Sequence, residues 1–482
     1  MNTDINITML CDFYEFTMGN GYLASGHQDV IACFDLYFRK VPDGGGFAIA
    51  AGLANAVEYI SQLHFDEEDI AFLRSKKCFS EEFLTYLRDF KFECDVYAVE
   101  EGTPVFPNEP LVTVVGPAIQ AQLLETMLLL TINHQSLIAT KANRIVRAAS
   151  GRGVFEFGSR RAQGNTAAIY GARAAYIGGC SGTACAICEQ LYGIPAVGTM
   201  AHSWVQMYDN EYEAFRIYAQ LYPDNCTLLV DTFNVLKTGI PNAIRVHNEI
   251  LKPMGKKLNG IRIDSGDIAY LTKKTRKMLD DAGLTETKIF VSNSLDEYII
   301  RDILLQGAEV DFFGVGERLI TSKSEPVFGG VYKLVAIGGD DGKFIPKIKF
   351  SENVEKITTP GMKKVYRLFS KETGKMQADL IALYDEQFDF NQPLDLFHPD
   401  FTWKRKVFEN YDIQELLIPI FKKGKLVYQI PDIKDTKKHC AEQISKLWDE
   451  VLRFENPQDY YVDLSQNLWD VKHNMLTDLN KK

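Results

Sequence analysis

The middle of the chain alternates short apolar runs with longer helical patterns, and this alternation constrains the fold more than any other feature. The runs are rich in β-branched or aromatic residues, and they are Val154–Phe157, Tyr176–Gly178, Ala196–Met200, Thr227–Val230, Gly260–Ile263, Lys288–Val291 and Val310–Phe313. Strands joined by helices run parallel and are connected by right-handed crossovers. The pattern therefore predicts an α/β fold. We expect an irregular α/β barrel of about seven strands, with an open doubly wound sheet as the alternative.

Polar motifs follow several of these runs. In barrels and in open sheets alike, the loops that leave the carboxyl ends of parallel strands form the ligand site. Gly-rich or charged segments come directly after the runs that end near positions 157, 200, 263, 291 and 313. We therefore expect one site, built from loops that are far apart in the sequence.

The segments on either side of the alternating region predict further elements. Helices are expected over about 66–90, 120–149 and 435–454, and β segments over 93–99, 111–115, 344–350 and 363–368. We expect three parts from this order. Residues 1–118 form an α+β N-terminal domain, residues 119–335 form the barrel, and residues 336–482 form a C-terminal region that packs on both and completes the first.

Composition excludes some classes of partner. The chain has 53 basic and 64 acidic residues, a net charge of −11, which makes it a poor candidate for binding nucleic acid or an anionic membrane. The most apolar stretch, Leu123–Ile132, is too short to span a bilayer. Met1–Leu10 lacks the order of a signal peptide, and the nine cysteines are typical of reduced thiols, so we expect a cytoplasmic protein. Any phosphate site must then be a local basic pocket.

The segment Gly198–Trp204 places His202 in a loop at the end of an expected strand. A neutral imidazole can act near pH 7 as a nucleophile, a base or a ligand. A structural histidine whose hydrogen bonds are made within the fold is the alternative, and position alone leaves the choice open.

The segment Phe155–Arg161 has a similar ambiguity. Its glycine turn and two arginines suit a phosphate, but a surface arginine pair fits equally well.

The segment Arg262–Asp267 makes a stronger case for function. Alternation along a strand sends Arg262 and Asp264 to the same face, which is the barrel interior if the barrel forms. Two inward charges are costly in a core, so we favour function over an internal ion pair. Asp264 and Asp267 are also suitable Mg²⁺ ligands, because Mg²⁺ usually binds one or two carboxylates together with substrate phosphates.

Three weaker motifs remain. The segment Phe312–Arg318 carries Gly314 and Gly316 directly after a strand, and such a turn can hold a phosphate, although a lone G-x-G is usually only a turn. The related loop Ser292–Ser294 offers small hydrogen-bond donors. The aromatic stretch Asp12–Met18 is of a kind more often found in a core than in a ligand platform.

Taken together and in order, these motifs resemble the nicotinate phosphoribosyltransferase family. The matching segments are Asp12–Met18, Glu101–Leu111, Phe157–Arg161, Gly198–Ser203, Arg262–Asp267 and Phe313–Gly316. Several separated motifs that occur in the same order identify a family with high specificity, whereas no single motif does. The resemblance extends from about Asp12 to about Leu368, and the chain after about Gln387 adds little to it.

The resemblance implies a fold and a reaction. Members of this family have the irregular α/β barrel of type II phosphoribosyltransferases and an N-terminal domain that C-terminal segments partly complete. They form homodimers whose active sites lie at the subunit interface. The implied reaction converts nicotinate and phosphoribosyl pyrophosphate into nicotinate mononucleotide and pyrophosphate, coupled to ATP hydrolysis, for NAD biosynthesis. ATP is then a co-substrate and Mg²⁺ the metal.

The resemblance also assigns roles to residues. His202 is similar to the histidine that ATP phosphorylates, and Arg262 and Asp264 are expected to be catalytic, with Asp264 also holding the metal. Phe157 and Tyr14, the latter from the partner subunit, are expected to sandwich the pyridine ring. Arg160 matches a contact to the phosphoribosyl group. The remaining expected substrate contacts are Ser181, Ser203, Asn293, Gly314 and Gly316.

Two rival functions stay open. A nicotinamide phosphoribosyltransferase shares the fold and the histidine. Ser181 stands near the place where the amide-using relatives are expected to carry an aspartate, and a hydroxyl there accommodates an acid substrate, which favours nicotinate. A non-catalytic ligand sensor built on the same barrel is the second rival, and the presence of His202, Arg262 and Asp264 argues against it.

Overall fold

The computed structural model describes residues 6–339 and 342–480, and these residues divide into two compact units. Unit 1 contains the two ends of the chain, Met1–Leu137 and Val327–Lys482, and unit 2 contains Ile138–Pro326. Helix α6 (Glu125–Ala148) includes the boundary between them. No helix within the described ranges is both long and apolar enough to cross a membrane.

Unit 2 contains a parallel six-stranded sheet. Its strands, in spatial order, are β7 (Gly182–Thr183), β6 (Gly153–Glu156), β11 (Phe312–Val315), β10 (Lys288–Ser292), β9 (Gly260–Ile263) and β8 (Thr227–Leu229). The last strand in sequence, β11, pairs with the first, β6, so the order is cyclic. A doubly wound sheet does not have this order. An isolated parallel bridge between Thr183 and Ala196 extends the edge beyond β7, and the described ladders leave the ring open between that bridge and β8.

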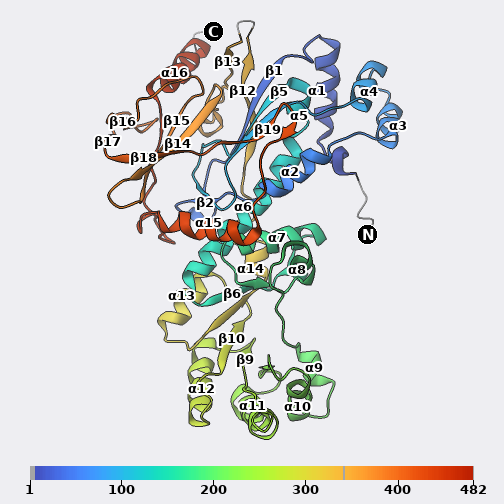
Figure 1. The fold of residues 1–482 in the computed structure, drawn as a ribbon, viewed down its shortest axis with the longest axis vertical. Coiled ribbons are helices and arrows are strands. Elements are labelled where there is room, and N and C mark those ends of the chain that lie inside the picture. Colours follow the sequence, from blue (N-terminus) through green and yellow to red (C-terminus); the bar gives the residue numbers. More distant parts are fainter. Residues whose placement is uncertain (1–5, 340–341, 481–482) are drawn as a thin grey trace. The chain divides into compact units, whose positions relative to one another are not determined.

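Helices connect the strands of unit 2, as the alternating sequence predicts (Figure 1). They are α7 (Asn165–Ile177), α8 (Ala186–Tyr192), α9 (His202–Gln206), α10 (Glu211–Leu221), α11 (Ile240–Val246), α12 (Ile268–Asp281), α13 (Glu297–Leu305) and α14 (Glu317–Ile320). Strand side chains such as Ile261, Ile263, Val291 and Val315 are fully buried. The apolar runs therefore form the centre of this unit, and the loops that follow them are free to carry polar groups.

Unit 1 combines segments from the two ends of the chain in one antiparallel sheet. The order is β13 (Phe344–Pro346), β12 (Val331–Gly338), β1 (Ile31–Tyr37), β5 (Val112–Pro117), β3 (Asp95–Ala98), β19 (Ile418–Lys422) and β20 (Lys425–Leu426). Figure 1 shows the blue N-terminal strands beside the orange and red C-terminal ones. Phe34 stacks on Tyr332 with ring centroids 4.8 Å apart, which joins the two segments in the core.

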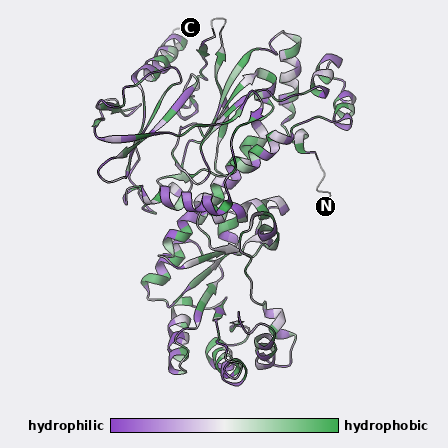
Figure 2. Cartoon of the chain, viewed as in Figure 1, coloured by the Kyte–Doolittle hydropathy of each residue, from purple (hydrophilic) through white to green (hydrophobic). Residues whose placement is uncertain are grey.

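A second sheet of unit 1 is entirely C-terminal. It contains β18 (Tyr411–Glu415), β14 (Lys363–Ser370), β15 (Met376–Leu383) and β21 (Val462–Leu464), and two small sheets pair β16 (Leu394–Phe397) with β17 (Arg405–Phe408) and β2 (Ala48–Ile49) with β4 (Pro104–Val105). The helices are α1 (Phe13–Ala24), α2 (Leu53–Gln62), α3 (Glu67–Ser75), α4 (Glu81–Arg88), α5 (Ala118–Gln122), α15 (Ile433–Ser445) and α16 (Gln466–Asn480). Figure 2 shows mostly hydrophilic residues along α15, whereas the strands carry both hydrophobic and hydrophilic residues.

Several of the expected elements differ from the observed ones. The helix predicted over 120–149 is divided into α5 and α6, and the helix predicted over 435–454 ends at Ser445. The strand predicted at Tyr176–Gly178 is wrong, because the Ala-rich sequence before it continues helix α7 to Ile177 and the strand forms later, as β7. The strand predicted at Ala196–Met200 is reduced to the single bridge at Ala196. The helix predicted over 66–90 is two helices, α3 and α4, which a turn at Lys77 with a φ of +58° separates.

Candidate functional site

His202, Arg262 and Asp264 lie together in unit 2. His202 Nε2 is 3.8 Å from Asp264 Oδ2, and Arg262 Nη2 is 3.6 Å from Asp264 Oδ1. The side chains of the three residues are 41%, 16% and 27% exposed, respectively, so a ligand can reach them. An imidazole, a guanidinium and a carboxylate therefore share one accessible location.

Strand β9 fixes the two charged residues of this group. Ile261 and Ile263 are fully buried, so the alternation of a strand directs Arg262 to the opposite face. Asp264 comes directly after the end of the strand and lies on the same side as Arg262. The cost of placing an arginine on a largely buried strand is offset here by a nearby carboxylate and by several hydrogen bonds.

The guanidinium of Arg262 is held by the end of β10 and by the loop that precedes α9. Arg262 Nε donates to Ser292 Oγ at 3.1 Å, at the end of β10. Arg262 Nη1 donates to Thr199 Oγ1 at 3.2 Å and to the Met200 carbonyl at 3.3 Å. Ser292 Oγ also donates to Asp264 Oδ1 in a short hydrogen bond. Three loops thus converge on Arg262, and they fix the orientation of its guanidinium group before any ligand binds.

Asp231, which lies just after β8, supports the turn that carries Asp264. Its Oδ2 accepts hydrogen bonds from the Asp264 backbone N–H at 2.9 Å and from Ser265 Oγ at 2.6 Å. Its Oδ1 is buried and has no hydrogen-bond partner among the described residues. Asp231 therefore fixes the turn after β9 and retains one acceptor oxygen that the protein leaves unused.

His202 is the first residue of α9, and one of its ring nitrogens is already engaged. Nδ1 lies 3.1 Å from Thr232 Oγ1, in the segment after β8. This contact orients the ring and leaves Nε2 on the side of Asp264. A hydrogen bond on one ring nitrogen selects which nitrogen of a histidine reacts.

Phe157 and the glycines of the β11 loop form a compact corner of unit 2. The Phe157 N–H donates to the Val315 carbonyl at 2.8 Å. A Cβ on Gly314 would approach the Phe157 ring to 2.5 Å, and a Cβ on Gly316 would come within 3.1 Å of the Phe157 carbonyl. The ring of Phe157 therefore leaves no room for a side chain at position 314.

Glu156 connects this corner to strand β7. It is fully buried and accepts hydrogen bonds from Thr183 Oγ1 at 2.6 Å and from the Gly158 N–H at shorter distance. Burial raises the pKa of its carboxyl above the usual range, and the two hydrogen bonds lower it in part. The side chain thus fixes the turn between Phe157 and Arg160.

The other predicted contacts are more exposed. Arg160 lies in the 3₁₀ turn Ser159–Arg161, Ser203 lies on α9, and Asn293 follows β10 with a φ of +86°. Among the described residues none of these three forms a hydrogen bond with His202, Arg262 or Asp264. Ser181 is half-buried before β7, with its N–H donating to the Val154 carbonyl at 2.6 Å. Tyr14 belongs to unit 1, where it is 43% exposed on α1.

Sequence reasoning missed three supporting residues: Asp231, Thr232 and Glu156. A signal for the first two was present, because Asp231 and Thr232 directly follow the expected strand Thr227–Val230, as the other site residues follow theirs. Glu156 gave no such signal, since it lies within an apolar strand and its partner Thr183 is 27 residues away.

The residues present fit a magnesium ion that is held mainly by its substrate. In residues 6–339 and 342–480 no three His, Cys, Asp or Glu side chains are grouped as a self-contained metal site. Asp264 and the buried, unpartnered Oδ1 of Asp231 offer one or two carboxylates. Mg²⁺ usually binds through such a small set together with phosphate oxygens.

Comparison with known proteins identifies similar chains over nearly the whole length. Three models of one family match: the nicotinate phosphoribosyltransferase N-terminal domain at residues 9–133, the nicotinate phosphoribosyltransferase family at 153–338, and the C-terminal domain at 362–472. The nicotinate phosphoribosyltransferase of Bacillus subtilis is 43% identical over 99% of this chain and 97% of its own length. That of Dictyostelium discoideum is 35% identical over 98% of this chain and 88% of its own.

A solved structure has the same fold. The crystal structure of human nicotinic acid phosphoribosyltransferase matches with a TM-score of 0.85 and 28% sequence identity, covering 96% of this chain and 99% of the human chain. The match therefore includes both compact units.

Proposed function

The chain belongs to the nicotinate phosphoribosyltransferase family, and we propose that it is the enzyme that joins nicotinate to the ribose 5-phosphate of phosphoribosyl pyrophosphate. The products are nicotinate mononucleotide, a precursor of NAD, and pyrophosphate. The observation that carries the proposal is the shared location of the His202 imidazole, the Arg262 guanidinium and the Asp264 carboxylate at the ends of parallel strands. Such an arrangement suits anionic substrates and a cationic reaction centre.

The reaction needs positioning more than proton transfer. The pyridine nitrogen forms a bond to C1 of the ribose while the bond from C1 to the pyrophosphate oxygen breaks, and the electron pair leaves with pyrophosphate. The ribose then has oxocarbenium character, as in glycoside cleavage. The ring nitrogen is already a free nucleophile, so no general base is required. Holding the two reactants in line and excluding water supplies most of the rate.

Named residues would hold each part of the substrates. Phe157 and Tyr14 of the partner subunit would stack on the two faces of the pyridine ring, which requires a homodimer with shared active sites. Arg262 would face the nicotinate carboxylate or the nearby ribose, and Arg160 the phosphoribosyl group. Asp264 would stabilise the positive charge that develops on the ribose.

The remaining contacts surround the phosphate and the pyridine substituent. Gly314 and Gly316 would surround the 5-phosphate, because a glycine turn exposes backbone N–H groups. The remaining proposed contacts are Ser181, Ser203 and Asn293. Asp264, with the free oxygen of Asp231, would hold Mg²⁺, which when bound neutralises charge on the departing pyrophosphate.

His202 would couple ATP hydrolysis to the reaction. Nε2 would attack the γ-phosphorus of ATP, forming an N–P bond as the bond to the β-phosphate oxygen breaks and ADP departs. Water later hydrolyses the phosphohistidine to inorganic phosphate. The added negative charge beside Arg262 would order the surrounding loops and tighten binding of the other substrates. The nine cysteines are not joined by disulfides, which supports a reducing compartment, and we propose the cytoplasm.

A competition assay tests the choice of substrate. Equal concentrations of nicotinate and nicotinamide, supplied with phosphoribosyl pyrophosphate, ATP and Mg²⁺, should yield mainly nicotinate mononucleotide. Ser181→Asp should shift the ratio towards the amide, because a carboxylate there repels the acid. Preferred turnover of nicotinamide by the native enzyme would establish the amide-using alternative instead. Ligand binding with no turnover of either compound would point to the sensor.

A further inference from the structure

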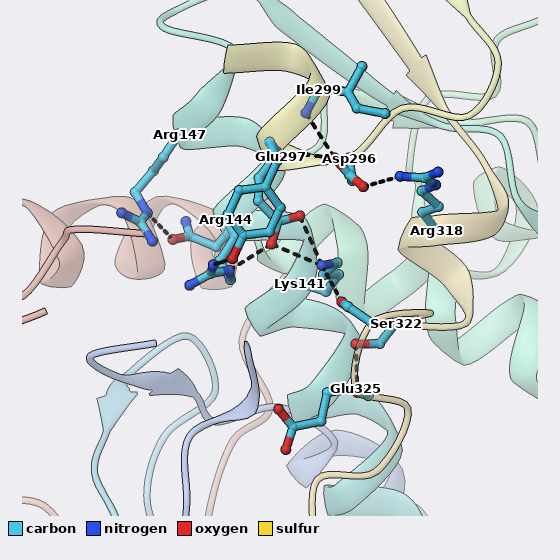
Figure 3. Close-up of polar contacts among 12 residues, drawn as sticks. Lys141, Arg144, Arg147, Asp296, Glu297, Ile299, Arg318, Ser322 and Glu325 are labelled. Atoms are coloured by element: carbon cyan, nitrogen blue, oxygen red, sulfur yellow. Dashed lines mark hydrogen bonds and ion pairs between the residues drawn. The ribbon is translucent and has the colours of Figure 1, made fainter. Parts of the chain in front are cut away.

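Two adjacent loops of the site are joined by an ion pair that the substrate contacts do not explain. The first loop follows β10 and contains Asn293, and the second, the Gly314–Gly316 loop, begins at Gly314 near the end of β11 and includes Gly316 directly after that strand. Asp296 lies at the end of the first loop, and Arg318 lies just beyond the second. Arg318 Nη1 donates to Asp296 Oδ2 in a short contact (Figure 3).

The loop after β10 has a backbone conformation that needs outside support. Asn293 and Ser294 are consecutive, and both have left-handed φ values, +86° and +54°. Residues other than glycine adopt such values only where the surrounding structure enforces them. The residue before this turn, Ser292, contacts both Arg262 and Asp264. The turn therefore also affects the position of the central charged residues.

The far end of this loop is anchored to helix α6 through Glu297. This carboxylate is fully buried at the start of α13, and Lys141 Nζ lies 2.9 Å and Arg144 Nε 2.8 Å from it. Lys141 Nζ also donates to Ser324 Oγ at 2.8 Å, in the turn that follows α14. Figure 3 shows Lys141 and Arg144 directed at Glu297, beside the Asp296–Arg318 pair. The segments that follow both loops are thus fixed to helix α6, one through Glu297 and the other through Ser324.

Asp296 connects the start of helix α13 to the Gly314–Gly316 loop. Its Oδ1 caps α13 by accepting from the Tyr298 N–H at 3.1 Å and the Ile299 N–H at 2.9 Å, while its Oδ2 holds Arg318. Arg318 is the second residue of α14, which begins directly after Gly316. One carboxylate therefore sets the end of the first loop and the helix that terminates the second.

We propose that Asp296 and Arg318 are positioning residues that hold the Asn293 loop and the Gly314–Gly316 loop in register to receive phosphoribosyl pyrophosphate. The inference rests on the proposed function and adds two residues to it. Neither residue needs to touch the substrate. Asp296 is only 13% exposed, and its two oxygens are already engaged by the helix and by Arg318.

Kinetics of two single variants and their combination test the pair. Asp296→Asn keeps a good helix cap but removes the charge, so the protein should remain folded. Asp296→Asn and Arg318→Gln should each raise KM for phosphoribosyl pyrophosphate by about fivefold, while KM for nicotinate changes less than about twofold. The double variant should be no worse than either single one, and Arg318→Lys should recover part of the loss.

A matched control lies on the same short helix. Glu317 pairs with Lys323 at 2.8 Å, both exposed, and Glu317→Gln should leave all kinetic constants within about twofold. Variants that match the native enzyme, or that change both KM values alike, or whose effects add, would overturn the inference. Should Arg318→Gln fail to fold, the split between KM values in Arg318→Lys decides. A native enzyme that makes no nicotinate mononucleotide would remove the proposed function itself, a separate result.

Discussion

At the scale of single residues, Gly314 connects the aromatic face of the site to its phosphate loop. The β11 strand pairs with β6, which places Gly314 opposite Phe155 and beneath the ring of Phe157. A methyl group at position 314 would meet ring atoms of Phe157 at 2.5 and 2.6 Å, well inside normal contact. The glycine is thus needed for packing in addition to its proposed contact with phosphate.

Gly314→Ala should therefore displace Phe157 and weaken nicotinate binding. We expect a loss of at least about tenfold in kcat/KM for nicotinate, because displacements near 1 Å at a positioned group have effects of this size. Gly21→Ala is the control, since a Cβ at this helical position has open space around it. Steady-state kinetics with varied nicotinate measure both. Native kcat/KM in Gly314→Ala would show that the ring of Phe157 does not set substrate affinity.

The sequence predicts the central residues of the site but not the residues that hold them in place. Alternation along a strand predicts that Arg262 and Asp264 share a face, and the two side chains are 3.6 Å apart. The support from Asp231 depends on the pairing of Leu229 with Arg262 between β8 and β9. Register between strands that are 30 residues apart is set by the whole sheet, and no local pattern encodes it.

At the scale of elements, helix α1 carries a titratable group in its first turn. Glu15 is fully buried, and Thr126 Oγ1 and the Asp12 N–H donate to it. Burial is the main cause that raises the pKa of this carboxyl from 4.5 to about 7, and the nearby charge of Glu125 adds to it. Between these two values the folded protein keeps a proton that the unfolded chain has released.

The stability of unit 1 should consequently fall as pH rises through this window. The loss from Glu15 is about 3 kcal/mol between pH 4.5 and 7, and it is complete above the folded pKa. Glu15→Gln should remove this pH dependence. The difference in unfolding free energy between the variant and the native protein should therefore change by about 3 kcal/mol between pH 4.5 and 7. Urea unfolding at several pH values measures it, with the exposed Glu82→Gln as control. Parallel curves for Glu15→Gln and native protein would contradict the assignment.

Most elements were predictable, and the errors have local causes. Strands β6, β9 and β10 lie within one residue of the predicted runs, because β-branched residues and turn signals agree there. The error at Tyr176–Gly178 arose where an aromatic and an isoleucine end an alanine-rich helix. Three residues are too few to distinguish a strand from the last turn of a helix by period alone.

At the scale of the whole molecule, the two ends of the chain form a single unit with buried charges. Lys363, on β14, pairs with Asp35, on β1, at 2.7 Å, and both side chains are 2% exposed. Thr113 Oγ1 completes the site by donating to Asp35 Oδ1 at 2.7 Å. This pair joins segments more than 300 residues apart.

Removing one partner of this pair should be costly. Lys363→Met leaves Asp35 as an unpaired buried carboxylate, and we expect a loss of about 3–5 kcal/mol in the free energy of unfolding. The double variant Asp35→Asn/Lys363→Met should recover much of this, because the amide oxygen still accepts from Thr113. Chemical denaturation followed by circular dichroism gives both values. A loss below about 1 kcal/mol in Lys363→Met would show that the pair does not hold the segments together.

The composite sheet of unit 1 is the part of the fold that sequence patterns predict least. The pairing of β19 with β3 brings Ile418 beside Ala98, across 320 positions of sequence. Hydrophobic alternation indicates that each segment is a strand but does not say which strand lies next to it. The parallel sheet of unit 2 is different, because successive βα units restrict the neighbours of each strand.

The most direct test of the account is to locate the phosphoryl group during turnover. The native enzyme is mixed with γ-labelled ATP, nicotinate, phosphoribosyl pyrophosphate and Mg²⁺, quenched at alkaline pH, and mapped by peptide mass spectrometry. We predict label on His202 alone, and in His202→Ala neither label nor stimulation of nicotinate mononucleotide formation by ATP. Full ATP stimulation in His202→Ala, or label on another residue, would contradict the central role of this imidazole.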